Sequence, residues 1–380
     1  MKKLLPEVCT IQYGFPFDSA KFSDSNGMPL IRIRDVVRGY SETYTTEEYK
    51  SEYIVHENDL LIGMDGEFNI AKWGKTPALL NQRVCRLAPK DSIDKDYLFY
   101  FMPIALKRIE EKTPFVTVKH LSAKELNKIE IPVLSLEEQR KIAETLSKVD
   151  ELIAFREQQL AKLDELVKAR FVEMFGDLVA PQCEYPELKL VDICADADDI
   201  KCGPFGTQLN RDEYKAKGVA VWEIPQINSG FSEMPTHFIT EEKAVILNAY
   251  SIEPGDIAMS RKGNVGKCGL FPENFKKGII HSDVLRIRVD KRKVDSCFMM
   301  YQLHFSEAVK RQIEMVSSGA IMAGINVTKL KQIKVRIPEL ENQRMFAAFV
   351  ERVDQQKQTI QQSLEKLELL KKALMQEYFG

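Results

Sequence analysis

The sequence predicts an α+β fold in which two globular domains are separated by two long helices packed as an antiparallel coiled coil, with an internal pseudo-twofold repeat. Three observations predict it. The chain is 380 residues long, a stretch of more than forty residues recurs at a fixed offset, and both copies of that stretch show the apolar spacing of a helix. A chain of this length exceeds the usual size of one hydrophobic core, so at least two domains are expected.

The composition is that of an ordinary globular protein. Hydrophobic residues make up 44% of the chain and charged residues 29%, unlike disordered or membrane-spanning chains. The chain reaches Pro6 without the apolar stretch of a secretory signal, so we expect a cytoplasmic protein with no membrane partner. The seven cysteines lack the close pairs that bind zinc, and we interpret them as reduced structural thiols. They are Cys9, Cys85, Cys183, Cys194, Cys202, Cys268 and Cys297.

An internal repeat organises the chain. When residue 126 is aligned with residue 330, the register is kept without a gap to the last residue, an offset of 204. Leu136-Glu137 and Gln139-Arg140 recur as Leu340-Glu341 and Gln343-Arg344, and Phe175-Gly176 recurs as Phe379-Gly380. Looser similarities lie upstream, where 27–33 resembles 218–224 and 57–61 resembles 253–257. The order is therefore domain, helix, domain, helix.

Both repeated tails, residues 135–176 and 339–380, are predicted to be long helices. Apolar residues recur at alternating steps of three and four, which predicts a coiled coil. The first seam is Ile142, Leu146, Val149, Ile153, Leu160, Leu163, Val167 and Met174, and the second is Phe346, Val350, Val353, Ile360, Leu364, Leu367, Leu374 and Tyr378. Because one chain holds two seams of equal length, we expect them to pack antiparallel as a rod roughly 50 Å long. The alternative is that each helix lies along its own domain.

The two globular domains, 1–134 and 188–338, read as short strands, turns and a few helices. A linker at 177–187 contains Pro181 and Pro186. The predicted strands are Leu30–Val36, Leu60–Met64, Arg83–Leu87, Val219–Ile224, Ile257–Met259 and Val284–Val289, and the predicted turns are Asp65-Gly66, Ser229-Gly230 and Pro254-Gly255.

The sequence contains no recognisable catalytic motif. The nearest approach to a phosphate-binding loop runs from Gly263 to Cys268, and it lacks both the first glycine and the hydroxyl that follows the lysine. The five histidines have no metal-ligand spacing, and there is no Gly-x-Ser-x-Gly elbow. We therefore predict a binding protein with no catalytic residue and no metal site.

The charge distribution gives modest support for a nucleic-acid ligand. The net charge is −2, and the second domain has the only clear basic surplus, with 22 Lys and Arg against 18 Asp and Glu. Phosphate neutralisation supplies most non-specific affinity for DNA, so a chain of this charge would hold DNA weakly by itself. A partner with more positive surface is implied.

Local motifs accompany the duplicated order. The motifs are Ile129-Glu130-Ile131-Pro132 before Leu136 to Ile142, Ile333 to Pro338 before Leu340 to Arg344, Gly14-Phe15-Pro16-Phe17 against Gly203-Pro204-Phe205-Gly206, and Asp256-Ile257 before the Gly263 to Gly266 loop. With two variable domains and two near-identical helices, this arrangement resembles the specificity (S) subunit of Type I restriction-modification systems over essentially the whole chain. One departure is that the first domain begins almost at residue 1, so a leading helix found in some relatives is expected to be short or absent.

The resemblance implies a function. Each domain would be a target-recognition domain reading one half of a bipartite double-stranded DNA sequence, and the helices would be the spacer between them. The chain itself would be non-catalytic and carry no cofactor. Two methyltransferase (modification) subunits would bring S-adenosylmethionine for adenine-N6 methylation, and motor-nuclease (restriction) subunits would bring ATP and Mg.

The candidate DNA-binding residues lie on loops, because base edges are read by Arg, Lys, Asn, Gln and carboxylates, and phosphates by cations, hydroxyls and backbone N–H groups. In the second domain they are Ser260, Arg261, Lys262, Asn264 and Lys267 of the glycine loop, followed by Gln208, Asn210, Gln226 and Asn228. In the first domain they are Asp65, Glu67 and Asn69 of the equivalent acidic loop, together with Gln82, Arg83 and Lys119. For each single residue, simple surface solvation is the alternative.

Four residues at the helix starts are candidates for partner binding: Gln139, Arg140, Gln343 and Arg344. Capping of the helix and support of the adjoining domain is the alternative for them. For the chain as a whole, the alternatives are a coiled-coil scaffold without DNA specificity and an enzyme of undetected type.

Overall fold

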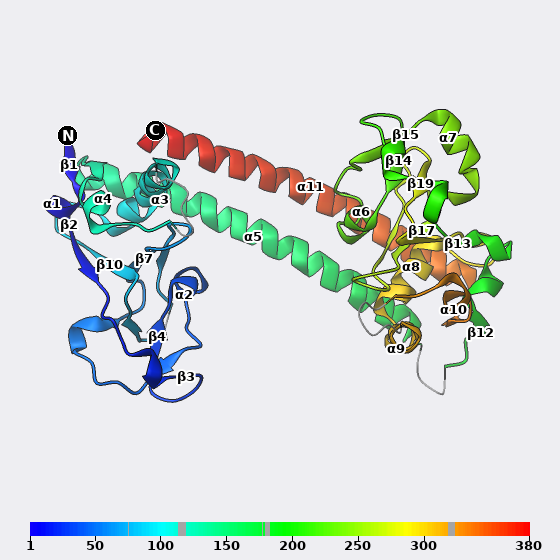
Figure 1. Ribbon diagram of the computed structural model, residues 1–380, viewed down its shortest axis with the longest axis horizontal. Helices are drawn as coiled ribbons and strands as arrows, with labels where there is room; N and C mark the ends of the chain where they lie inside the picture. The colour runs from blue at the N-terminus through cyan, green and yellow to red at the C-terminus, as the bar shows by residue number, and fades with distance from the viewer. Residues whose placement is uncertain (75, 113–118, 177, 179–182, 318–323) are drawn as a thin grey trace. The chain divides into compact units, whose positions relative to one another are not determined.

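The computed structural model describes residues 1–74, 76–112, 119–176, 178, 183–317 and 324–380. These residues form two compact units, the first made of 1–158 with 361–380 and the second of 159–360. Each unit holds one globular head, the first part of one long helix and the last part of the other (Figure 1). We call residues 1–135 the first head and residues 183–339 the second head.

The described residues of the first head form three sheets. The pair β1-β11 joins Lys2–Leu4 to Glu130–Pro132, and a four-stranded sheet has the order β2 (Cys9–Tyr13), β10 (Val84–Pro89), β7 (Leu60–Gly63), β8 (Ile70–Lys72). A five-stranded sheet has the order β3 (Phe22–Ser23), β5 (Tyr44–Thr45), β4 (Met28–Ile31), β9 (Ala78–Leu80), β6 (Ile54–Val55). The helices are α1 (Leu5–Val8), α2 (Ile33–Arg38), α3 (Lys95–Lys112) and α4 (Ala123–Asn127).

The second head repeats this plan. Its sheets have the orders β12 (Glu187–Lys189)-β21 (Lys334–Arg336), β13 (Ile200–Cys202)-β20 (Val284–Ile287)-β17 (Ile257–Ser260)-β18 (Cys268–Leu270), and β15 (His237–Ile239)-β14 (Val219–Trp222)-β19 (Gly278–Ile280)-β16 (Ser251–Ile252). Its helices are α6 (Ile224–Asn228), α7 (Glu241–Ile246), α8 (Ser296–Phe305), α9 (Glu307–Val316) and α10 (Val327–Lys331). In each head one strand pair is parallel, β4 with β9 and β14 with β19, and the other pairs are antiparallel.

Buried details of the two heads match as well. Gly14 and Gly203 each lie against the backbone of a neighbouring strand, where a Cβ would meet the carbonyl oxygen of Asn81 at 2.0 Å and of His281 at 2.3 Å. No other residue fits there, which explains why the glycine occurs in both copies. The similarity between the two domains is therefore structural and is not confined to the helices.

Two of the predicted strands extend into residues that are helical in the structure, and the predicted strand Val284–Val289 ends two residues early, at Ile287. The strand expected at Leu30–Val36 ends at Ile31 and α2 begins at Ile33, and the strand expected at Val219–Ile224 ends at Trp222 before α6. The cause is helix capping. The Asp35 carboxylate accepts a hydrogen bond from the Arg32 N–H at 2.9 Å, and this begins a helix within a run whose composition is typical of a strand.

The long helices are α5 (Leu136–Phe175) and α11 (Leu340–Phe379), and within each unit their segments lie side by side and antiparallel (Figure 1). In the first unit Lys371 Nζ lies 2.6 Å from Asp150 Oδ1, and in the second Lys357 pairs with Asp164. Lys357 and Lys371 occupy the seam positions between Val353 and Ile360 and between Leu367 and Leu374, and each has an acidic partner on the opposite helix. The predicted antiparallel coiled coil is confirmed, and the alternative in which each helix lies along its own domain alone is wrong.

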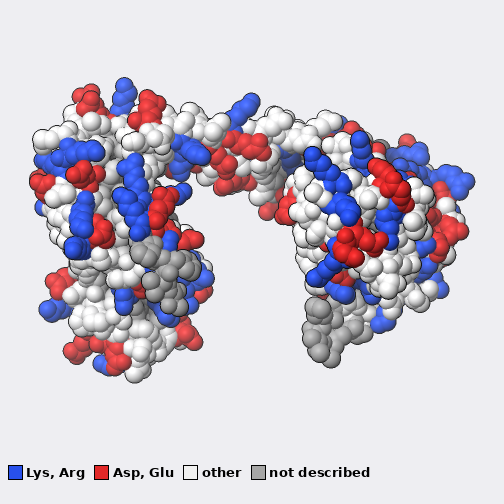
Figure 2. All heavy atoms as spheres, turned by 45° about the horizontal axis from the view of Figure 1, so that its top comes forward, with Lys and Arg blue, Asp and Glu red and all other residues white. Residues whose placement is uncertain are grey.

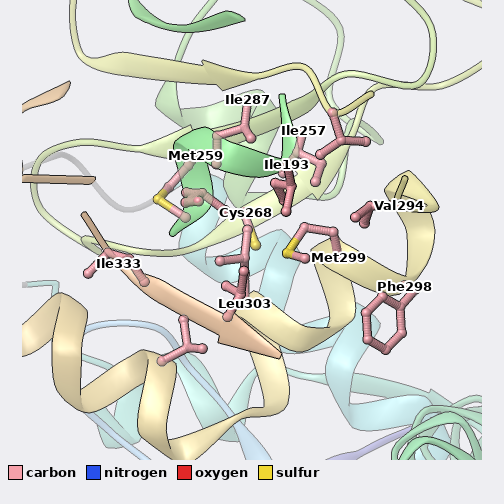
Figure 3. Close-up of a cluster of buried hydrophobic side chains, with 14 of the residues drawn as sticks. Ile193, Ile257, Met259, Cys268, Ile287, Val294, Phe298, Met299, Leu303 and Ile333 are labelled. Atoms are coloured by element: carbon pink, nitrogen blue, oxygen red, sulfur yellow. The ribbon is translucent and has the colours of Figure 1, made fainter. Parts of the chain in front are cut away.

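The last turn of each long helix packs into the core of a head. The end of α11 packs into the first head, and the end of α5 packs into the second head. Phe379, from the end of α11, lies 5.2 Å from the Tyr97 ring in the core of the first head. Phe175, from the end of α5, lies 4.8 Å from the Phe298 ring beside the second-head core, part of which is shown in Figure 3. The hydrophobic core of each unit therefore contains side chains from both the head and the long helices.

All seven cysteines are free thiols, and five are buried. Burial raises the pKa of Cys9, Cys85, Cys194 and Cys268 to about 12, so these thiols stay protonated and unreactive at neutral pH. Within the described ranges, no helix combines the length and apolar character needed to cross a membrane.

Candidate nucleic-acid interface

The candidate loop of the first head, 64–69, joins β7 to β8 and is fastened to two distant segments. The Met64 N–H donates to the Arg83 carbonyl at 2.8 Å, and the Leu121 N–H donates to the Met64 carbonyl at 2.7 Å. Gly66, at φ 77°, donates to the Lys119 carbonyl at 2.9 Å. The structure therefore brings together the loop, Arg83 and Lys119, which the sequence places far apart.

A three-residue cluster lies at this junction. Asp65 Oδ1 is 2.5 Å from His120 Nδ1, and Arg83 Nη1 is 3.0 Å from the same ring nitrogen and 3.7 Å from Asp65 Oδ1. Arg83 has φ 71°, a backbone conformation that is uncommon for a residue other than glycine. His120 was missed by sequence reasoning, because no local pattern connects it with a loop 55 residues away.

The remaining candidates of the first head differ in their exposure and in their hydrogen-bond or ion-pair partners. Glu67, Asn69 and Gln82 are exposed, and the Asn69 amide donates to the nearby Glu67 carbonyl at 3.3 Å. Lys119 is partly buried, and its ammonium lies 3.3 Å from Glu110. Lys119 therefore contacts the loop through its backbone carbonyl, whereas its ammonium group pairs with Glu110.

The candidate loop of the second head, 261–267, joins β17 to β18 and is tightly closed. Gly263 and Gly266 have φ values of 69° and 85°, and the Ser260 N–H donates to the Lys267 carbonyl at 2.8 Å. The Arg261 N–H donates to the Asp283 carbonyl at 2.9 Å. The two glycines allow turns that other residues rarely adopt, which is the physical reason for the glycine pattern seen in the sequence.

Arg261 is a structural residue of this loop. Its guanidinium donates to the carbonyls of Ile325 at 3.1 Å and Ser282 at 3.2 Å, and it lies 4.8 Å from the centre of the Phe205 ring. These contacts occupy the group that was expected to reach DNA. Its neighbour Lys262 lies 2.8 Å from Asp283 and is half-exposed, and Asn264 is exposed.

Burial also corrects two candidates of the second head, the secondary candidate Gln226 and the favoured loop residue Ser260. Gln226 is buried, and its amide accepts from the Glu223 N–H at 3.1 Å and donates to the Met234 carbonyl at 3.3 Å, so it caps α6 and has no free group for a base. Ser260 is completely buried, with its hydroxyl 3.4 Å from Asn228.

Three further candidates of the second head are exposed. They are Gln208, Asn210 and Asn228. Gln208 already accepts from the Tyr250 hydroxyl at 3.0 Å, so of the three it is the most constrained.

At the helix starts, the two glutamines support the heads. Gln139 is fully buried; its amide accepts from the Asp94 N–H at 2.7 Å and donates to the Leu134 carbonyl at 2.9 Å. Gln343 is equally buried and accepts from the Asp295 N–H at 2.9 Å. For both, the structure favours the alternative of helix-start support over the predicted contact with a partner.

Arg140 and Arg344 remain exposed at equivalent positions, 204 residues apart. Arg140 Nε lies 3.9 Å from Asp94 Oδ2. The predicted contact of these two side chains with a partner stays a prediction.

Charge is mixed on the face seen in Figure 2, where Lys and Arg side chains are interspersed with Asp and Glu in both units. This agrees with the small net charge. On this face any phosphate contact would therefore rest on individual cations and not on a continuous basic surface.

Comparison with known proteins gives a consistent answer. A family model described as the Type I restriction modification DNA specificity domain matches residues 1–165 and again 199–369. The Type I restriction enzyme EcoBI specificity subunit of Escherichia coli is 28% identical over 376 residues, covering 92% of this chain and 78% of that protein. The MjaVIII specificity subunit of Methanocaldococcus jannaschii is 24% identical, covering 91% of this chain and 87% of that protein.

Solved structures share the fold. The S subunit of a Type I restriction-modification system from M. genitalium aligns with a TM-score of 0.62 at 17% identity, covering all of this chain and 96% of that one. A chain from a study of complex assembly and conformational transition in a type I R-M system aligns with a TM-score of 0.60, also at 17% identity, covering all of this chain and 97% of that one.

Proposed function

The chain belongs to the Type I restriction-modification DNA specificity family, and from that premise we propose that it reads a bipartite, asymmetric DNA target and directs partner methyltransferase and motor-nuclease subunits to it. The observation that carries the proposal is the pair of heads. They share one framework but present different side chains from the loops at 64–69 and 261–267. Two different readers on one chain fit a target with two unrelated halves.

The proposed division of labour leaves chemistry to the partners. This chain positions the complex on DNA, S-adenosylmethionine is bound by the methyltransferase subunits, and ATP and Mg by the motor-nuclease subunits. We place its action in the cytoplasm, together with the DNA that it reads.

Two copies of the methyltransferase subunit would bind, one on each half of the repeat. The support for this number is the duplication itself, which presents Arg140 and Arg344 at equivalent exposed positions. A duplicated surface of this kind can seat two copies of one partner in the same way.

An experiment on the purified chain, with and without a co-purified methyltransferase, tests this proposal. Alone, the chain is expected to bind DNA weakly and to show no methylation, cleavage or ATP hydrolysis. With its partner it is expected to give adenine methylation at a specific sequence. Turnover by the rigorously purified chain would contradict the proposed role, and a stable complex without sequence-specific DNA binding would indicate a scaffold.

A further inference from the structure

The two candidate loops occupy the same place in their heads, as their backbone contacts show. The Met64 N–H donates to the Arg83 carbonyl, and the Arg261 N–H donates to the Asp283 carbonyl. Asp65 forms an isolated bridge with His120, and Lys262 forms one with Gly324. A glycine of positive φ follows each of them. Position 65 therefore corresponds to 262, and position 83 corresponds to 283.

At these matched positions the charges are exchanged. The first head pairs Asp65 with Arg83 at 3.7 Å, and the second head pairs Lys262 with Asp283 at 2.8 Å. In both heads the cation is the more exposed partner, at 52% for Arg83 and 43% for Lys262, against 22% for Asp65 and 28% for Asp283. Each head thus presents one cation beside one carboxylate. In the first head the loop supplies the carboxylate, Asp65, and in the second head the loop supplies the cation, Lys262.

We propose that Arg83 and Asp65 together read a G·C base pair in the first half-site, with His120 as a positioning residue, and that Lys262 and Asp283 do so in the second. This inference rests on the proposed function. In the major groove guanine offers two acceptors, N7 and O6, and cytosine offers the N4 amino donor. A cation beside a carboxylate therefore places donors opposite the guanine acceptors and an acceptor opposite the cytosine amino group.

A contact with phosphate fits this geometry less well. The Asp65 carboxylate neutralises Arg83 locally and would repel a phosphate oxygen, whereas a base pair has a donor to satisfy it. His120 also lies 3.0 Å from Arg83 and 2.5 Å from Asp65, so it restricts both side chains. A restricted pair suits the reading of a fixed pattern of donors and acceptors.

The test compares single substitutions in the complete complex with its methyltransferase, with the methylated motif read by sequencing host DNA. Arg83→Asn removes the cation, and asparagine tolerates the positive φ at this position. The wild-type first half-site is expected to contain a G·C pair whose preference over other pairs falls roughly 10- to 100-fold in this variant. The second half-site is expected to stay the same.

Lys262→Ala is the matched control, because it should relax one position of the second half-site and none of the first. Asp65→Asn tests the carboxylate: it should weaken the preference at the Arg83-dependent position without moving it. Arg83→Lys keeps the charge, should retain part of the preference, and serves as the test variant if Arg83→Asn does not fold.

Several results would overturn the inference. They are a motif that Arg83→Asn leaves unchanged at every position, relaxation in both half-sites at once, or uniformly weaker methylation with a salt slope reduced by about one, which indicates a phosphate contact. A wild-type complex with no bipartite motif would instead overturn the proposed function, and this inference with it.

Discussion

The two heads are alike where their sheets are joined and different in the charged side chains of their candidate loops. Arg86 in the first head donates to the Ile54 carbonyl at 2.8 Å, and Arg286 in the second donates to the Ser251 carbonyl at 2.7 Å, and each of these bonds joins two sheets. At the candidate loops, by contrast, Asp65 stands where the other head has Lys262. The loop side chains can therefore differ between the heads without a change of fold, because the shared contacts that stabilise the framework do not involve them.

The largest expected effect concerns what the heads have in common, the pair of long helices. Insertion of one heptad after Gln158 in α5 and one after Ile360 in α11 keeps both seams in register. Seven residues add about 10 Å, or roughly three base pairs. We expect the same half-sites separated by a spacer about three pairs longer, at reduced activity because the half-sites also rotate around the duplex.

Methylome sequencing of the insertion variant measures this effect. Insertion into α5 alone is the control, since it breaks the antiparallel register and should abolish assembly. An active double-insertion complex that keeps the original spacer would show that the helices do not set the spacing.

The second prediction uses the symmetry of the cores. Phe379→Ala and Phe175→Ala each remove a buried ring from one unit, and each should destabilise that unit by about 3–5 kcal/mol. Hydrogen exchange can follow the two units separately, and each variant should lose protection mainly in its own. Leu369→Ala on the exposed face of α11 is the control and should change stability by less than about 0.5 kcal/mol. Equal loss in both units would contradict independent cores.

A third prediction separates support of the heads from partner binding. Gln139→Ala removes a fully buried amide together with its hydrogen bonds to the Asp94 N–H and the Leu134 carbonyl, and should cost about 2 kcal/mol of stability. Gln343→Ala should cost about as much in the second unit. Arg140→Ala should leave thermal stability almost unchanged and weaken binding of the methyltransferase in a pull-down titration. The reverse pattern would restore the glutamines as partner contacts.

The smallest effects are expected within the loop of the second head. Arg261→Ala should loosen the loop and lower stability by about 1–2 kcal/mol, since two carbonyl contacts are lost. Lys267→Ala should leave stability unchanged and reduce the salt slope of DNA binding by about one. Melting temperatures and binding isotherms at several salt concentrations distinguish the two roles. An unchanged slope for Lys267→Ala would remove this side chain from the interface.

Much of the architecture could be predicted because its signals are local or periodic. The seams of α5 and α11 and the offset of 204 are visible in the sequence, and they predict both the helices and their pairing. What could not be predicted depends on tertiary contacts. The burial of Gln139 is decided by a segment more than forty residues upstream, and the juxtaposition of Asp65 with His120 by a strand bridge. The sequence therefore predicts which loops are candidates for the interface. It does not predict which side chains of those loops are left without intramolecular contacts.

The central claim is that one chain carries two different DNA readers on one duplicated framework. Methylome sequencing of a host that expresses the wild-type chain with its methyltransferase tests it most directly. We expect adenine methylation at a single motif made of two unrelated half-sites separated by a spacer of fixed length and unspecified sequence. A palindromic motif, or a continuous one without a spacer, would contradict the claim.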